Sequence, residues 1–564
     1  MHNLIDKLVA RLPLDFRVLF RQFLLRVIDL EALSIQADVS GFLGQFAGVL
    51  LMLSFVHSLV TYVGLIIQRT AVDRIDFLLH MEHYFIANMM LVIGLITVVS
   101  WDSTFPDRRD VMVLAPLPVA PHTILAAKVC ASAAVLGIAI LTLNVATGIL
   151  LPLLLGPMHG LDWGFFRALP AFWFTLVAAS AFLYCSVLTV QGFTALLLPR
   201  RIFLRVSAFL QLATFGLFLG VYFVQPSITT AAAIADPQNH WILASSPSYW
   251  FLALFNQLNG TLPVRFGWLA SRAWAGLGFA VCEAAGLSIL CYLRTMKKTV
   301  EEPDLIPGGR GFAWVPALGS PLETAVAFFS IRSLIRSRQH RVAFAFYLAI
   351  VLGLALSLLR HELAAARPLS LSMDFLTSTF MMMLFAVAGL RSVFSLPISL
   401  TANWVLRTTQ LRVTAEYVAA TRRTIILLGV IPVLILSLAL SFSFRPAMQV
   451  GAHLGVLALL GCAMAEICLI GFYKVPFTCS YLPGKSNVQL VFWGFVIALI
   501  AVIIPCLQFE QRALGDLQSF ILLLSLLIAG LGALYAYNRH RAKAAVIYFE
   551  ELPEEPITTL KLSA

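Results

Sequence analysis

The chain has 564 residues, of which 60% are hydrophobic and 12% are charged, and its formal net charge is +11. A soluble domain carries about twice that share of charge. Mean hydropathy is +0.90, and apolar runs longer than about eighteen residues recur, each long enough to cross a bilayer as a helix. These runs are continuous rather than alternating, which excludes a membrane β-barrel. The sequence predicts an all-α polytopic membrane protein with no nucleic-acid partner.

The first predicted element is an interfacial elbow helix over residues 14–33. Arg17, Arg21 and Arg26 follow a drifting polar face of this segment, and Phe, Leu and Val residues lie opposite. A helix with this pattern lies in the membrane interface rather than across the bilayer. Charged residues follow Met1 where a signal peptide would have an apolar region, so we expect no cleavable signal peptide.

Six membrane spans are predicted after this helix, each close to the roughly twenty residues that a bilayer requires. They cover residues 45–68, 84–100, 124–156, 170–198, 203–225 and 273–293. A long outer loop, residues 226–272, separates the fifth span from the sixth. Within this loop Ser245, Ser246 and Pro247 favour the start of a helix.

A polar segment over residues 101–128 separates the second span from the third, with the sequence WDSTFPDRRDVMVLAPLPVAPHTILAAK. Its four prolines exclude one continuous helix. Ser103 is a suitable cap and Pro106 suits a first turn, which predicts a short surface helix from about residue 106 to 114. The charges of Asp107, Arg108, Arg109 and Asp110 alternate in sign, as on a salt-bridged docking surface.

The second half of the chain repeats this order after a basic linker, residues 294–321. A second elbow helix over 323–341 places Arg332, Arg336 and His340 on one face. Six further spans are predicted at 342–359, 375–395, 424–444, 450–473, 488–508 and 518–537, followed by a tail, 538–564. The sequence therefore predicts about 12 spans in two tandem halves, 1–293 and 322–537.

A second polar segment, residues 396–423, follows the second span of this half. When the two segments are aligned, Leu117, Val119 and Ala126 match Leu411, Val413 and Ala420, and Lys128 falls on Arg422. In both segments this basic residue stands where an apolar run begins. Three identities alone would be weak evidence of a repeat. The two segments also occupy equivalent positions, each after the second span of its half, and this strengthens the evidence.

The distribution of basic residues predicts the orientation. Placing the N-terminus, the linker and the tail in the cytoplasm assigns all but nine of the 39 Lys and Arg residues to that side or its boundary. Both polar segments then face the cytoplasm, as do both termini.

This layout resembles the permeases of type-2 ATP-binding-cassette (ABC) transporters. Such permeases have an elbow helix, six spans, a cytoplasmic coupling helix between spans two and three, and a re-entrant element between spans five and six. The tract VMVLAPLPVAPHTILAAKV, residues 111–129, is similar to a leucine-proline and small-small-lysine stretch of that family. The second half departs from the pattern, because only residues 508–517 separate its last two spans.

The resemblance implies a permease subunit, an exporter in the cytoplasmic (inner) membrane of a bacterium, driven by separate ABC ATPase subunits, two per chain. ATP would be bound by the partner, and we expect neither a cofactor nor a metal in this chain. The tract LPGKS, residues 482–486, lacks a phosphate-binding loop's first glycine, because Cys479 stands there. The implied ATPase-coupling residues are Asp107, Arg108, Arg109, Asp110, Lys128, Arg407, Arg412 and Arg422.

Polar residues inside the predicted spans form a second group of candidates. Glu283 and Glu466 lie within spans, where an ionisable group exposed to lipid costs several kcal/mol. Two interpretations stay open for both, a role in substrate passage and a role in holding helices together. His57 and Asn144 are interpreted as interhelical hydrogen-bonding residues. For the metal-like group Asp76, His80, Glu82 and His83 a solvated outer loop is the preferred interpretation.

The alternative function is an integral membrane enzyme, such as a transferase acting on a lipid-linked substrate. Such a site needs clustered carboxylates, histidines or arginines on a loop at the interface. The predicted outer loops carry scattered charges instead, so we expect a transport subunit rather than an enzyme. The duplicated layout disfavours a non-transporting scaffold, and no residue indicates the substrate.

The predicted orientation is testable with single cysteines in a cysteine-free chain. Arg108→Cys and Arg412→Cys should be protected from an impermeant thiol reagent added outside intact cells, because both lie in segments that face the cytoplasm. Gln238→Cys and Arg367→Cys should react. Labelling of Arg108→Cys from outside would reverse the orientation and every assignment that depends on it.

Overall fold

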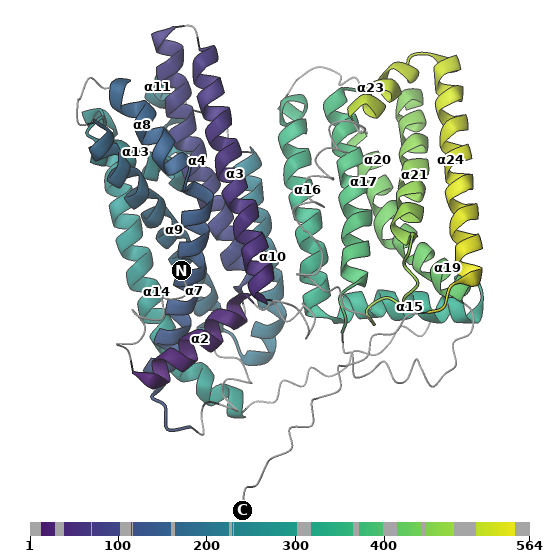
Figure 1. Ribbon diagram of the computed structural model, residues 1–564, viewed down its shortest axis with the longest axis horizontal. Helices are drawn as coiled ribbons and strands as arrows, with labels where there is room; N and C mark the ends of the chain where they lie inside the picture. The colour runs from purple at the N-terminus through teal and green to yellow at the C-terminus, as the bar shows by residue number, and fades with distance from the viewer. Residues whose placement is uncertain are drawn as a thin grey trace, which may run out of the picture. The chain divides into compact units, whose positions relative to one another are not determined.

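The computed structural model describes residues 13–28, 39–68, 70–101, 114, 117–158, 164–224, 228, 230–301, 317–364, 371–398, 414–441, 447–478 and 504–547 (Figure 1). These residues form α-helices, short 3₁₀ turns and one π-helical turn, and none of them is in a strand. Ten of the described helical segments are long and apolar enough to cross a membrane, and each overlaps a predicted span. The chain is an all-α polytopic membrane protein.

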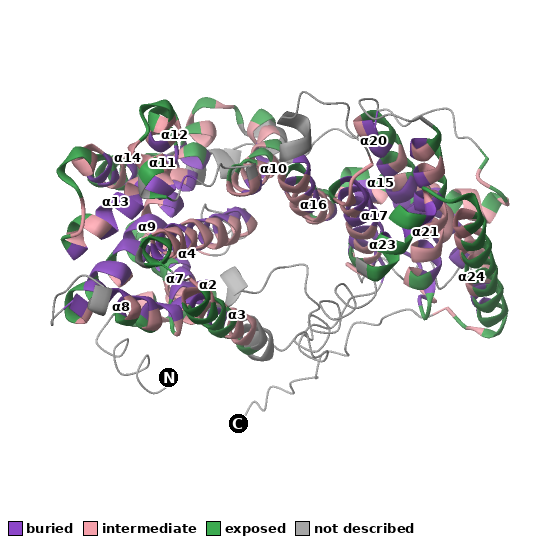
Figure 2. Ribbon diagram, turned by 90° about the horizontal axis from the view of Figure 1, so that it is seen from above, coloured by how far each residue is buried: buried purple, intermediate pink, exposed green. Residues whose placement is uncertain are grey.

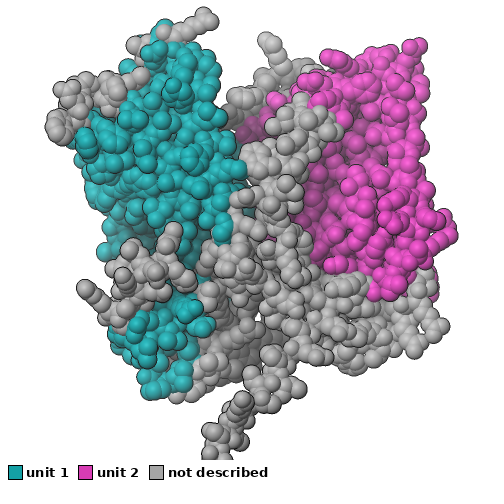
Figure 3. All heavy atoms as spheres, viewed as in Figure 1, with its two compact units in different colours: residues 1–30, 38–309, 484–491 teal, residues 31–37, 310–483, 492–564 magenta. Residues whose placement is uncertain are grey.

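Contacts divide the chain into two compact units (Figure 3). Unit 1 contains residues 1–30, 38–309 and 484–491, and unit 2 contains residues 31–37, 310–483 and 492–564. The principal division falls between Gly309 and Arg310, inside the segment predicted as a linker.

Besides the short helices of residues 230–266, the described part of unit 1 contains six long helices and two shorter ones around a buried apolar core. They are α2 (Leu14–Ile28), α3 (Val39–Ile67), α4 (Ala71–Val99), α7 (Pro121–Asn144), α8 (Thr147–Met158), α9 (Gly164–Leu197), α10 (Arg200–Val224) and α14 (Gly267–Glu301). α10 covers the predicted fifth span. Within this unit α2 lies across the end opposite the turn between α3 and α4 (Figure 1).

The predicted outer loop is folded into a series of short helices. They are α11 (Ala231–Ala235), η1 (Pro237–Asn239), α12 (His240–Ser245), α13 (Pro247–Asn259) and η2 (Val264–Phe266). We call residues 230–266 the cap. α13 begins at Pro247 after the N-cap Ser246, as predicted, and its buried aromatic side chains pack among α4, α9 and α14.

Two arginines fix the ends of the cap helices. Arg167 of α9 donates from Nε to the carbonyl oxygen of Leu258 at 2.9 Å, and Arg272 of α14 donates from Nη1 to that of Ala244 at 2.9 Å. Both carbonyls belong to the last turn of a helix, where they lack a partner within the helix and where a positive charge is favourable.

The start of α4 contradicts the prediction of a solvated loop before residue 84. α4 begins at Ala71, after a capping box formed by Thr70 and Asp73. The group Asp76, His80, Glu82 and His83 therefore lies on a membrane-spanning helix. The polar residues were misleading because Glu82 and His83 are buried against the cap rather than hydrated.

The predicted third span, 124–156, is divided in two. α7 ends at Asn144 and α8 begins at Thr147. The buried hydroxyl of Ser54 on α3 accepts hydrogen bonds from the backbone N–H groups of Ala146 and Thr147, at 3.1 and 3.4 Å. This side chain satisfies the backbone where the helix is interrupted.

Unit 2 is also built of helices. They are α15 (Pro321–Arg336), α16 (Arg338–Ala364), α17 (Met373–Phe394), α19 (Thr414–Ile425), the π-turn η4 (Ile426–Val430), α20 (Ile431–Ser441), α21 (Ala447–Leu469), α23 (Ile504–Ala513) and α24 (Leu517–Ala544). The predicted span 488–508 lies mostly outside the described residues. α24 is exposed over most of its length, whereas α17 has a largely buried face (Figure 2).

Two boundaries in unit 2 differ from the prediction. α15 ends at Arg336, and His340 belongs to α16, where it is buried and hydrogen-bonds the carbonyl oxygen of Leu396 at 2.9 Å. His340 therefore does not share an exposed face with Arg332 and Arg336. α19 begins at Thr414, so the last ten residues of the predicted coupling segment 396–423 already belong to a spanning helix.

Candidate coupling site

Arg422, a candidate coupling residue, lies in the last turn of α19, the helix that follows the second polar segment. Its guanidinium makes a two-point ion pair with Glu466 of α21: Nε contacts Oε1, and Nη2 donates to Oε2 at 3.2 Å. Asn538 of α24 donates from Nδ2 to Oε2 of the same carboxylate at 2.8 Å. One polar network therefore joins three helices of unit 2.

The charged groups of this network are buried, so the loss of either partner is expected to destabilise the fold. The Glu466 side chain is 3% exposed and that of Arg422 is 15% exposed, and the Arg422 guanidinium lies 4.7 Å from the ring centroid of Tyr535 on α24. A charge buried this deeply is tolerated because it is paired and hydrogen-bonded. Of the two interpretations left open for Glu466, this geometry favours a role in holding helices together.

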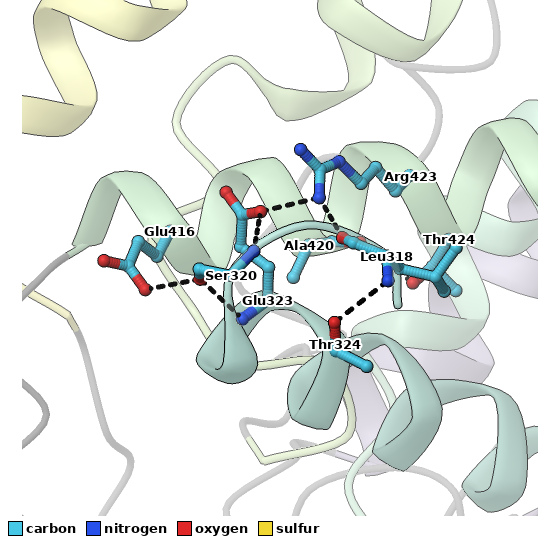
Figure 4. Close-up of polar contacts among 8 residues, drawn as sticks. All are labelled: Leu318, Ser320, Glu323, Thr324, Glu416, Ala420, Arg423 and Thr424. Carbon is cyan, nitrogen blue, oxygen red and sulfur yellow. Dashed lines mark hydrogen bonds and ion pairs between the residues drawn. The ribbon is translucent and has the colours of Figure 1, made fainter. Parts of the chain in front are cut away.

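The neighbouring Arg423 connects α19 to α15 (Figure 4). It donates from Nη1 to Oε2 of Glu323 at 2.6 Å and to the carbonyl oxygen of Leu318. Glu323 also forms a capping box with Ser320, whose hydroxyl donates to Oε2 of Glu416 at 2.9 Å. The start of α15 is therefore bonded to two turns of α19 at once.

Gly319 is required for this junction. Its φ of +109° lies in the region that favours glycine, and a Cβ at this position would collide with the side chains of Arg423 and Glu323. The sequence places a residue without a side chain where the arginine must reach the backbone of Leu318.

Unit 1 has an equivalent but apolar junction. Leu19 and Phe23 of α2 pack in one buried cluster with Ile124, Ala127 and Ala131 of α7, the helix that follows the first polar segment. Lys128 is buried in the same place, with Nζ 5.1 Å from the ring centroid of Phe23. Lys128 thus lies beneath α2 and is not exposed on a docking surface.

The remaining predicted site residues lie in different environments. Asp107, Arg108, Arg109, Asp110, Arg407 and Arg412 lie outside the described residues. Glu283 is half-buried on α14, and within the described part of the chain no hydrogen bond or ion pair joins its carboxylate. His57 hydrogen-bonds the hydroxyl of Tyr84 at 3.0 Å, which makes it the interhelical residue that was predicted. Asn144 likewise donates from Nδ2 to Sδ of Met89 on α4, at 3.0 Å.

Sequence reasoning missed Asn538, Glu323 and a second buried pair in unit 2. In that pair His453 of α21 contacts Oε1 of Glu510 on α23 at 2.8 Å and Oγ1 of Thr379 on α17 at 2.9 Å. The partners are far apart in the sequence, so local spacing gives no signal. His453 lies inside the predicted span 450–473, whereas Glu510 lies just outside the predicted span 488–508. Among the described residues, no group of three or more His, Cys, Asp or Glu residues could hold a metal ion.

Comparison with protein-family models, with curated proteins and with solved structures found no significant match.

We expect Glu466→Leu to lower the free energy of unfolding by about 3–5 kcal/mol, because it leaves the Arg422 guanidinium buried without its counter-charge. The double variant Arg422→Leu/Glu466→Leu should recover part of that loss. Unfolding of the detergent-solubilised chain by denaturant gives both values.

Glu323→Gln is the matched control. Its partner Arg423 is 40% exposed, and Gln also suits a capping box, so the expected loss is about 1 kcal/mol or less. Equal losses for Glu466→Leu and Glu323→Gln would contradict the assigned importance of the buried pair.

Proposed function

We propose that this chain is the membrane-spanning permease subunit of a type-2 ABC transporter, an exporter in the cytoplasmic membrane of a bacterium. The observation that supports the proposal most is a repeated junction. In each unit a short helix ahead of the first span packs on the helix that follows the long polar segment, α2 on α7 and α15 on α19. These are the places of an elbow helix and of a coupling segment in such permeases.

The junction offers a physical route for coupling. Leu114 and Val119 of the first polar segment pack against the cluster between α2 and α7. In unit 2 the start of α15 is bonded to α19, which is bonded in turn to α21 and α24. A force applied to either polar segment would therefore reach spanning helices through packed or hydrogen-bonded contacts.

In this proposal the chain has twelve spans, with α10 and residues 488–508 as the fifth span of each half. α2 and α15 are the elbow helices, and both termini are cytoplasmic. Each half presents one docking segment, so one chain serves two separate ATPase subunits, which bind the ATP. The substrate crosses within the lipid bilayer, and the chain itself carries out no chemistry.

Reversal of two charges in the first docking segment tests this proposal. Arg108→Glu/Arg109→Glu should weaken co-purification with the ATPase by about tenfold or more, because complementary charges across the contact become repulsive. The control is Arg265→Glu, which lies in the cap at the predicted opposite face. Unchanged ATPase binding and transport-coupled hydrolysis in the double variant would favour the alternative, an integral membrane enzyme.

The proposed stoichiometry is testable separately. The detergent-corrected mass of the complex should correspond to one permease chain and two ATPase subunits, because the chain holds two six-span halves with one docking segment each. A complex with two permease chains and two ATPase subunits would show that the second half is not an equivalent partner.

A further inference from the structure

Glu82 joins the cap of unit 1 to α4 from deep within the bundle. It lies eleven residues after Ala71, which places it about 17 Å along the helix axis from the start of α4. It is 4% exposed. Its Oε2 accepts a hydrogen bond from Nδ2 of Asn256 on α13 at 3.1 Å, and Oδ1 of Asn256 accepts one from Thr261 at 2.6 Å.

The next residue fixes the other end of α13. Nε2 of His83 hydrogen-bonds the hydroxyl of Ser248 at 3.0 Å, and its ring stacks on that of Tyr249 with centroids 4.2 Å apart. Two adjacent side chains of α4 therefore hold the first turn and the last turn of the same cap helix.

Three carboxyl groups of the described chain are buried to a similar degree but have different partners. Glu466 is paired with Arg422, and Glu510 with His453. In the described residues the hydrogen-bond partner of Glu82 is a neutral amide, and no cation pairs with it. An ionised carboxylate in that position would cost several kcal/mol, whereas a neutral carboxyl group costs far less.

We propose that Glu82 is a proton-binding site: it holds a proton while the cap is packed on α4, and loss of that proton releases the cap. This proposal does not depend on the transport function. The packed state binds one proton, and the released state, in which the carboxyl is hydrated, loses it above about pH 5. Raising the pH therefore favours release, by up to about tenfold per pH unit for one proton.

Other titratable groups lie on the elements that pack against α4. They are Asp73, Arg74, Asp76, His80, His83 and Tyr84 on α4 itself, His57 and Tyr62 on α3, His122, Lys128 and Cys130 on α7, Arg167, Tyr184 and Cys185 on α9, Tyr222 on α10 and Tyr249 on α13. None of these side chains hydrogen-bonds or ion-pairs with the Glu82 carboxyl among the described residues. An imidazole with its ordinary pKa changes charge near neutral pH, so the experiment includes a histidine variant.

The experiment measures how fast a thiol in the cap reacts in a full-length, cysteine-free chain. Ala253→Cys places the thiol on the buried face of α13, where Ala253 is 4% exposed, and Val264→Cys places it at a position that is 98% exposed. The ratio of the two rates removes the intrinsic pH dependence of the thiol. We expect this ratio to rise between about pH 5 and about pH 7, approaching tenfold per unit, and to level off above that range, where the packed and released states bind equal numbers of protons. It should stay flat in Glu82→Gln and rise as in the parent chain in His80→Gln.

Infrared spectroscopy gives an independent readout of the proton. The parent chain should show, at the acid end of the series, a C=O band of a protonated carboxyl that disappears in Glu82→Gln. Gln mimics the neutral carboxyl, so Glu82→Gln should fold as well as the parent, and its failure to fold would overturn the proposal. The same pH-dependent ratio in Glu82→Gln, or the absence of that band, would also overturn it.

Discussion

The lack of water in the bilayer core is the constraint on which the rest of this structure depends, because each polar group there needs a partner from the protein. The carbonyl oxygens at the end of α4 show how this is met. Nε2 of Gln191 on α9 donates to the carbonyl oxygen of Trp101 at 2.6 Å, and Nε2 of Gln211 on α10 donates to the carbonyl oxygen of Val98 at 2.8 Å. Side chains of other spans thus complete the helix end, and the same contacts fix which helices are neighbours.

Much of the fold follows from the sequence, because a span is recognised by its own apolar length. Ten of the predicted spans have a counterpart, and the starts of α2 and α13 were predicted to within a residue. The errors lie where a polar residue inside a span has a distant partner. The sequence suggested that Glu82 is solvated, because its partner, Asn256, is 174 residues away. No local pattern can indicate that pairing.

The candidate site was predictable in position but not in contacts. The sequence singled out both Arg422 and Glu466, one as part of a docking segment and the other as an intramembrane acid. Their ion pair joins α19 to α21, so two residues that were singled out for different reasons belong to one arrangement. Lys128, which aligns with Arg422, lies in unit 1 with Nζ 5.1 Å from the ring centroid of Phe23, a contact between α7 and α2.

A comparison of the two units extends this point to the segment before the last span. In unit 1 α13 is held by His83 and Glu82 of α4. In unit 2 the ten-residue α23 supplies Glu510 to His453 of α21, although this half has no long loop there. Both units therefore fix that segment through a buried histidine. Among the described residues, Glu510 faces the imidazole of His453 directly, whereas Glu82 faces the amide of Asn256. The two units therefore differ in the partner of the buried acid that contacts this segment.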